Sequence, residues 1–196
     1  MTRLFFALRV PPNGILERIY RRLKGEQGKL LKCVEPEKQH FTLKFLGDSG
    51  VDTGTLITAA RSAVEGYRPF PVRLMEAGAF PSWKRPSVIW IGPGEDGPLS
   101  DLSRELDEVL HNSIGSRLEK RGYSPHLTIA RVRRDKTVPS ARIGQVIEDE
   151  LARAGPSDVE FQVDRVELIS SILSPDGPHY TTVEKIYLDQ STNDRR

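Results

Sequence analysis

The segment QHFTLKFL, residues 39–46, decides the prediction of the fold. Its aromatic, β-branched and alternating apolar residues are typical of a strand with one buried face. Because residues i and i+2 of a strand point to the same side of a sheet, His40 and Thr42 should project together. The residues expected to face the core on the other side are Phe41, Leu43 and Phe45.

The segment HLTIARV, residues 126–132, repeats this pattern. It places His126 and Thr128 on one face of a second strand, with Leu127 and Ile129 on the buried face. Each segment also ends a strand–helix–strand unit, so the chain contains an internal repeat. The first unit comprises residues 4–10, 15–30 and 39–46, and the second comprises residues 88–91, 99–110 and 126–132.

Two such units predict an α+β protein with two related lobes of mostly antiparallel sheet, with helices outside and a central cleft. The alternating residues at 159–163 and at 166–168 lie on opposite parities, which predicts a β-bulge near Asp164 and Arg165. We expect one bilobal domain over residues 1–190 and a flexible tail over residues 191–196. The other expected elements are a helix at 52–65 ended by Gly66, a strand at 70–80, a helix at 143–151, a turn at 174–177 and a return strand at 180–188.

The composition excludes several other classes of protein. Of the 196 residues 37% are apolar, and the longest apolar run has five residues, whereas a membrane helix needs ~20. Arg9 and Pro11 interrupt the first apolar run before it is long enough for a secretory signal. The single cysteine, Cys33, excludes an internal disulfide and a zinc site of Cys/His spacing. We therefore expect a soluble, cytoplasmic protein without membrane association.

Positive charge gathers in one part of the chain. The formal net charge is +2, yet residues 117–136 contain seven Lys and Arg against Glu119 and Asp135, a local net charge of +5. Such a segment suits an anionic ligand, for example a phosphate group or a short nucleic acid. A solvated charged loop has the same composition, so charge alone does not decide between these two interpretations.

The two His-x-Thr-x motifs carry the candidate chemistry. An imidazole, with an ordinary pKa near ~6.5, accepts a proton when neutral and donates one when charged. Two facing imidazoles therefore supply the base and the acid that cleavage of a phosphodiester requires. Threonine hydroxyls and a guanidinium can hold the nonbridging oxygens, so no metal or other cofactor is needed. A lone histidine on a half-buried strand is more often a packed residue, but the same pair at matching positions of a repeat favours a catalytic site.

The sequences around the motifs resemble a known family. They are RLFFALRVP (3–11), HFTLKFLGD (40–48), GAFPSWKRPSVIWIG (78–92), SPHLTIARV (124–132) and SSILSPDGPHY (170–180). Together they are similar to the RNA 2′,3′-cyclic phosphodiesterases of the 2H phosphoesterase superfamily, historically called 2′-5′ RNA ligases. The resemblance extends from Arg3 to about Leu188. It implies a bilobal α+β fold with a pseudo-twofold axis and a cleft between the lobes.

The resemblance also implies an activity, the metal-independent hydrolysis of a terminal 2′,3′-cyclic phosphate of RNA to a 2′-phosphate. By position, His40 is the proton donor to the departing 3′ oxygen, and His126 is the proton acceptor that activates water. Thr42 and Thr128 bind the phosphate, and Arg131 adds a further phosphate contact. The expected partners are RNA ends with a 2′,3′-cyclic phosphate, such as tRNA fragments or short oligonucleotides. We expect no cofactor and a monomer.

The place of Arg131 poses a geometric problem. In a regular strand it shares the parity of Leu127 and Ile129, which face the core. A bulge, a strand end or a strong twist must therefore turn Arg131 toward the cleft. Without one of these, Arg131 is a rim residue or part of a structural ion pair.

Four further residues have open roles. Cys33 stands where the family often has a tryptophan, and no step of the chemistry requires its thiol. Lys44 is expected on the face of the first motif, where it either steers RNA or is a solvated residue at the strand end. His179 and Tyr180 are weaker candidates for residues that line the cleft.

Two other functions use the same cleft. The reverse reaction would join RNA ends through a 2′-5′ linkage with the same residues. A non-catalytic module would bind RNA or a nucleotide without chemistry, but such a module has no need for a matched pair of His and Thr.

Overall fold

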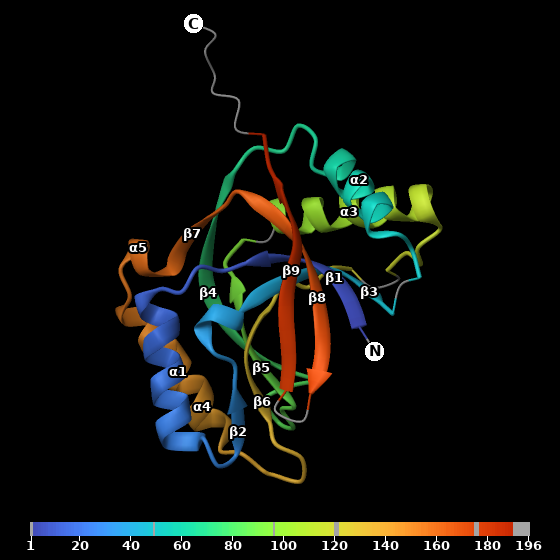
Figure 1. Ribbon diagram of the computed structural model, residues 1–196. Coiled ribbons are helices and arrows are strands. Elements are labelled where there is room, and N and C mark those ends of the chain that lie inside the picture. Colours follow the sequence, from blue (N-terminus) through green and yellow to red (C-terminus); the bar gives the residue numbers. More distant parts are fainter. Residues whose placement is uncertain (1, 49, 96, 120–121, 175–176, 190–196) are drawn as a thin grey trace, which may run out of the picture.

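The computed structural model describes residues 2–48, 50–95, 97–119, 122–174 and 177–189 (Figure 1). The first part of the chain forms β1 (Thr2–Arg9), α1 (Gly14–Gln27), β2 (Leu31–Cys33), the 3₁₀ turn η1 (Pro36–Lys38), β3 (His40–Gly47), α2 (Thr53–Ala63) and β4 (Phe70–Phe80). The second part forms β5 (Val88–Pro93), α3 (Gly97–Ile114), β6 (Leu127–Val132), α4 (Ser140–Arg153), α5 (Pro156–Val159), β7 (Glu160–Val163), β8 (Arg165–Ser174) and β9 (Gly177–Tyr187). The α+β class is confirmed.

One antiparallel sheet relates the two halves of the fold. Its strand order is β7-β4-β5-β6-β3-β1-β8-β9, and β2 pairs with β6 outside this path. The two motif strands, β3 and β6, meet at the centre through Phe41 and Leu127, each of which follows a motif histidine. From this pair outward, β1 and β8 on one side correspond to β5 and β4 on the other. A pseudo-twofold axis therefore passes between the two motifs.

We call the β3-β1-β8-β9 half, with α2 and α3, the first lobe, and the half with β6, β5, β4, β7 and β2, with α1 and α4, the second lobe. The helices lie outside the sheet in two pairs, α1 with α4 and α2 with α3 (Figure 1). The chain passes between the lobes several times. Helix α1 and strand β2 join the second lobe between β1 and β3 of the first, and α3 packs on the first lobe between β5 and β6 of the second. After α2 the chain enters the second lobe, where β4 pairs with β5, and after Asp164 it returns to the first, because β7 pairs with β4 whereas β8 pairs with β1. Each lobe is thus built from both halves of the chain.

The helices α1 and α2 begin close to the expected positions, but they end at Gln27 and Ala63, before the expected ends at 30 and 65. The Asn13 side chain accepts a hydrogen bond from the Leu16 amide at 3.0 Å and caps α1, and Asp52 accepts one from the Thr55 amide at 3.1 Å and caps α2. Helix α1 buries an apolar stripe that packs into the main core. The stripe consists of Ile15, Leu16, Ile19 and Leu23.

One expectation about the strands is wrong. No bulge joins the segments on either side of Asp164, because they are separate strands, β7 and β8, in different lobes. The parity of the apolar residues changes there because the chain leaves one sheet edge and enters another strand. The turn expected at 174–177 includes residues 175 and 176, which lie outside the described residues, as does the tail at 191–196. The return strand is confirmed, since β9 pairs antiparallel with β8.

Among the described residues, none of the helices is both long enough and apolar enough to cross a membrane.

Candidate active site

A β-bulge in β3 decides which side chains reach the cleft. Thr42 lies opposite Ala7 on β1, but Lys44 lies opposite Phe6, so Leu43 is an extra residue without its own partner. Leu43 and Lys44 both point inward, and each is at most 4% exposed. The parity then reverses, and Phe45, which was expected in the core, is 52% exposed and lines the cleft. The bulge corrects the expectations for Lys44 and Phe45.

The second motif contains the same bulge. On β5, Ile89 lies opposite Ala130 and Trp90 lies opposite Thr128, so Ile129 is the extra residue of β6. Ile129 and Ala130 are both buried, and Arg131 turns to the side of Thr128. This bulge removes the geometric objection to Arg131. Because both motifs bulge at their fourth residue, Arg131 and Phe45 occupy equivalent positions on opposite sides of the pseudo-twofold axis.

The five residues predicted for the site lie together. An open cleft of about 820 Å³ is lined by His40, Thr42, His126, Thr128 and Arg131. Aromatic rings and further cations complete its walls, and Cys33 lies among them. These additional residues include Phe5, Phe45, Tyr180, Arg3, Lys32 and Lys38. Tyr180 is therefore at the cleft, whereas its exposed neighbour His179 lies on the opposite face of β9.

The two imidazoles are oriented in the same way. His40 Nδ1 lies 2.9 Å from the carbonyl oxygen of Lys38, and His126 Nδ1 lies 2.8 Å from the carbonyl oxygen of Ser124. Because a carbonyl oxygen only accepts hydrogen bonds, each Nδ1 carries the hydrogen and donates it. Nε2 of each ring is then the nitrogen that can exchange a proton with a ligand.

The surroundings of the two rings differ. The His40 ring lies 5.1 Å from the Phe5 ring and 5.3 Å from the Tyr180 ring, measured between centroids. The His126 ring meets the Phe80 ring edge-on at 4.9 Å. Burial lowers the pKa of His40, and the hydrogen bond to the Lys38 carbonyl opposes this effect. The positive charges of Arg9, His126 and Arg131 lower the pKa of His40 further.

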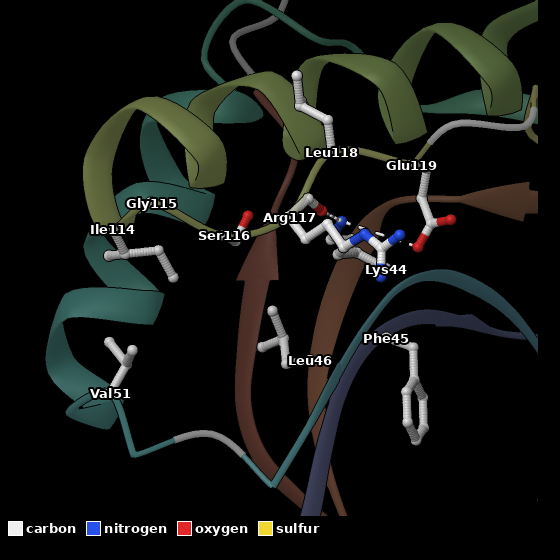
Figure 2. A pocket seen from close by; sticks show the side chains of 10 residues that line it. All are labelled: Lys44, Phe45, Leu46, Val51, Ile114, Gly115, Ser116, Arg117, Leu118 and Glu119. Atoms are coloured by element: carbon white, nitrogen blue, oxygen red, sulfur yellow. Dashed lines mark hydrogen bonds and ion pairs between the residues drawn. The ribbon is translucent and has the colours of Figure 1, made fainter.

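Lys44 has neither of the roles expected for it. Its side chain is 3% exposed, and its ammonium group forms an ion pair with Asp107 and donates to the carbonyl oxygen of Arg117. It lies in the wall of a second cavity, of about 670 Å³, between β3 and the segment after α3 (Figure 2). Phe45 lies at the edge of both cavities. Lys44 therefore ties β3 to α3 and does not meet the ligand of the cleft.

The basic segment 117–136 is divided between different places. Arg117 lies at the second cavity, whereas Arg131 lies in the cleft between the two motifs, and residues 120 and 121 are outside the described residues. Lys32 was not predicted as a site residue, yet it lies opposite Arg131 on β2 and lines the same cleft. Its strand, β2, has only three residues, which are too few to show an alternating pattern in the sequence.

The Cys33 thiol is poorly suited to act as a nucleophile. Burial raises the pKa of the Cys33 thiol, and this effect outweighs the positive charges of Lys24 and Arg133. A protonated thiol is a poor nucleophile. The described residues contain no group of three or more His, Cys, Asp or Glu side chains that could hold a metal ion.

Comparisons with known proteins point to one family. The sequence profile of the 2′-5′ RNA ligase superfamily matches residues 11–173. The RNA 2′,3′-cyclic phosphodiesterase of Methanothermobacter thermautotrophicus is 37% identical over 172 residues, which are 86% of this chain and 88% of that protein. The protein of the same name from Archaeoglobus fulgidus is 37% identical over 181 residues, which are 91% of this chain and 96% of that protein.

Solved structures share the fold. A protein of Thermus thermophilus superimposes with a TM-score of 0.70 at 27% identity and covers 95% of this chain and 97% of its own. LigT of E. coli, in a complex with 3′-AMP, superimposes with a TM-score of 0.67 at 23% identity and covers 96% of this chain and 99% of its own. At this level of identity the similarity concerns only the fold.

Proposed function

The chain belongs to the 2′-5′ RNA ligase superfamily, and from this premise we propose that it hydrolyses the terminal 2′,3′-cyclic phosphate of RNA to a 2′-phosphate without a metal ion. The observation that carries the proposal is the pair of His-Thr motifs on β3 and β6, which face one cleft across a pseudo-twofold axis. Each imidazole has its Nδ1 hydrogen bonded to a backbone carbonyl, so Nε2 is available at each.

The two imidazoles divide the proton transfers. His126 accepts a proton from the water that attacks phosphorus, and His40 donates a proton to the 3′ oxygen as its bond to phosphorus breaks. The family resemblance supplies this order, because the two motifs are nearly identical in residue type. General acid and general base catalysis each contribute ~10²–10⁴-fold, so both are large terms in the rate.

Three side chains hold the phosphate while the proton transfers occur. The Thr42 and Thr128 hydroxyls donate to nonbridging oxygens from the two lobes, and the Arg131 guanidinium adds a charged donor. Negative charge on these oxygens grows as phosphorus becomes pentacoordinate, so fixed donors stabilise the transition state more than the substrate. The anion also favours protonated His40 and raises its pKa, which opposes the lowering by burial.

The walls of the cleft suit the end of an RNA chain. The exposed ring of Phe45, which stacks on the buried ring of Phe5, offers a surface on which a nucleobase can stack. Across the pseudo-twofold axis, Lys32 and Arg131 present two positive charges at directly opposed positions of β2 and β6. Two cations placed in this way suit the successive phosphates of an RNA chain.

Single substitutions test the proposed function. His40→Ala and His126→Ala should each lower turnover of a 2′,3′-cyclic nucleotide by ~10²–10⁴-fold, with a cooperative thermal transition retained. His179→Ala, which removes an exposed histidine from the far face of β9, is the matched control and should retain activity. Full activity in either cleft variant would refute the division of roles. Binding of RNA without any turnover by the wild type would favour a non-catalytic module.

A further inference from the structure

The pseudo-twofold axis relates the two catalytic histidines, but their cross-strand neighbours differ. Arg9 on β1 lies directly opposite His40 on β3. In the second lobe, Ile91 lies opposite Leu127, so the position equivalent to Arg9 is the next residue of β5, Gly92. A guanidinium therefore stands beside one histidine, and a residue without a side chain stands beside the other.

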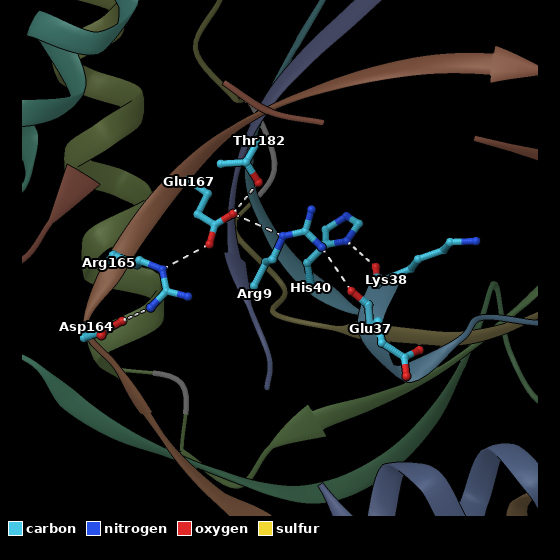
Figure 3. A network of polar contacts seen from close by, with 8 residues as sticks. All are labelled: Arg9, Glu37, Lys38, His40, Asp164, Arg165, Glu167 and Thr182. Carbon is cyan, nitrogen blue, oxygen red and sulfur yellow. Dashed lines mark hydrogen bonds and ion pairs between the residues drawn. The ribbon is translucent and has the colours of Figure 1, made fainter. Parts of the chain in front are cut away.

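Arg9 connects β8 to the turn that precedes His40. Its Nε donates to Glu167 Oε2 at 3.1 Å, and its Nη1 donates to the backbone carbonyl of Glu37 at 3.0 Å. Glu37 and Lys38 belong to η1, and the Lys38 carbonyl accepts the hydrogen bond from His40 Nδ1. Figure 3 shows Arg9 between Glu167 and the Glu37 carbonyl, and His40 at the carbonyl of the next residue, Lys38.

Glu167 is a buried acid that the proposed reaction does not use. Its side chain is 1% exposed, and besides Arg9 it accepts hydrogen bonds from Arg165 Nε at 3.1 Å and from Thr182 Oγ1 at 2.8 Å. Burial raises the pKa of Glu167, but the bonds from Thr182 and Arg165 and the charge of Arg9 outweigh burial, so the carboxyl stays ionised. A buried carboxylate held by three donors is a fixed anchor for Arg9.

We propose that Arg9, anchored by Glu167, is a positioning residue for His40, which holds the turn that orients the imidazole and makes the two histidines of the pseudo-symmetric site unequal. The inference rests on the proposed function, because it concerns the histidine that takes part in that reaction. Arg9 acts in two ways, through the Glu37 carbonyl on the shape of η1 and through its charge on the protonation of His40.

The charged and titratable groups around His40 define what removal of Arg9 should do. Arg9 faces it from β1, His126 and Arg131 face it from the second lobe, and Tyr180 contacts it from β9. Lys38 in η1 is paired with Glu35 at 2.6 Å. Loss of Arg9 removes one of the three positive charges that lower the pKa of His40, so this pKa should rise.

The test uses NMR of ¹⁵N-labelled histidine in Arg9→Met, together with its kinetics. The chain has four histidines, so single substitutions suffice to assign their signals. We expect the pKa of His40 to rise, the fraction of its Nδ1–H tautomer to fall, and kcat to drop ~10-fold or more, since a small misplacement of a catalytic group costs up to ~10²-fold. Because the change acts on orientation, KM should change less than kcat.

Two further variants separate the two effects of Arg9. Arg9→Lys keeps the positive charge but cannot donate to Glu167 and to Glu37 with one planar group. The pKa of His40 should then stay low, while the tautomer shift and most of the loss in kcat remain. Arg61→Met is the control, because it removes an exposed arginine that pairs with Glu184 of β9 at 3.0 Å, and it should leave the His40 signals unchanged.

Unchanged His40 signals and unchanged kcat in folded Arg9→Met would overturn the inference. If Arg9→Met fails to fold, Glu167→Gln decides, because it keeps the shape and the hydrogen-bond acceptor but removes the charge that anchors Arg9. It should shift the His40 tautomer in the same direction, and no shift would overturn the inference. The NMR readout needs no substrate, so a wild type that does not hydrolyse cyclic phosphates would refute the proposed function separately.

Discussion

Single residues set the chemistry of the cleft, and the bulges at Leu43 and Ile129 show which of them the sequence could reveal. The pairs His40/Thr42 and His126/Thr128 follow from strand periodicity alone, and the structure brings them together. The faces of the residues that follow each motif cannot be read from periodicity. One unpaired residue in each strand reverses which side of the sheet the later side chains point to. Nothing in the letters of HFTLKF marks the bulge, so Lys44 and Phe45 were assigned to the wrong faces.

Arg131 provides a prediction at this scale. Arg131→Met should lower kcat/KM for a 2′,3′-cyclic mononucleotide by ~10²–10³-fold, because a charged donor to the nonbridging oxygens is lost. Arg131→Lys should recover only part of the loss, because an ammonium lacks the planar fork of the guanidinium. Arg73→Met removes an exposed strand arginine of β4 and is the control in the same steady-state assay. Equal activity of wild type and Arg131→Met would show that the bulge does not deliver Arg131 to the phosphate.

The pH dependence of the reaction should report the lowered pKa of His40. The plot of kcat/KM against pH describes the free enzyme and should be bell-shaped, because one imidazole must be charged and the other neutral. The two limbs give the two pKa values of the coupled pair, and the lower value sets the acidic limb whichever ring donates the proton. Burial and nearby positive charges lower the pKa of His40, so the acidic limb should lie below the ordinary value of ~6.5. NMR titration of both rings assigns the limbs. An acidic limb above that value would contradict the account of the electrostatics.

At the scale of elements, the longer strands and helices are readable from periodicity, while the short ones are not. Strand β2 and turn η1 have three residues each, so they show no pattern, yet they bring Lys32 to the cleft and hold the Lys38 carbonyl at His40. The change of parity at Asp164 was visible in the sequence. Its cause, a crossing between the lobes rather than a bulge, depends on pairings far apart along the chain.

The contact between α1 and α4 gives a prediction about stability. Glu150 on α4 is buried and accepts hydrogen bonds from Arg22 at 2.8 Å and from Arg18 at 3.1 Å. Glu150→Gln should lower the free energy of unfolding by ~1–3 kcal/mol at pH 7, because a charged pair becomes a neutral contact. Urea denaturation measures this change, and Glu148→Gln, on the exposed face of α4, is the control.

The difference in the free energy of unfolding between wild type and Glu150→Gln should become smaller at acidic pH. The hydrogen bond from Arg22 holds the pKa of the Glu150 carboxyl below its usual range, and burial opposes this only in part. The stabilisation is therefore fully present above the unfolded-state pKa and is lost as the pH falls through the lower folded-state pKa. The gap between wild type and Glu150→Gln should shrink between pH 7 and about pH 3. A difference in unfolding free energy that stays constant over this range would mean that Glu150 contributes packing and no charge interaction with Arg22 and Arg18.

At the scale of the whole molecule, the pseudo-twofold axis explains why one sequence motif, used twice, produces one site. The repeat predicted two lobes with a shared cleft, and the sheet order confirms this arrangement. The exchange of strands between the lobes was not predicted, because no local pattern specifies which lobe β4 and β8 join. The axis also relates Phe45 to Arg131, so an aromatic side and a cationic side flank the two motif histidines.

This asymmetry predicts a preference for RNA chains over single nucleotides. Lys32→Gln should lower kcat/KM for a short RNA with a 2′,3′-cyclic end, because an upstream phosphate loses its partner, and it should leave a cyclic mononucleotide unaffected. The slope of log affinity against log salt should decrease by ~0.7 for the RNA. Lys185→Gln, on the exposed face of β9, is the matched control. Equal losses for both substrates would place Lys32 at the reacting phosphate instead of along the chain.

The most direct test of the central claim is the identity of the product. The purified protein is incubated in EDTA with a short RNA that ends in a 2′,3′-cyclic phosphate, and the terminal phosphate is identified by ³¹P NMR. The account predicts a 2′-phosphate, formed as His40 protonates the departing 3′ oxygen. A 3′-phosphate would contradict the assigned leaving group. If the cyclic end survives in EDTA but is hydrolysed after a divalent metal is added, catalysis by the two histidines alone would be contradicted.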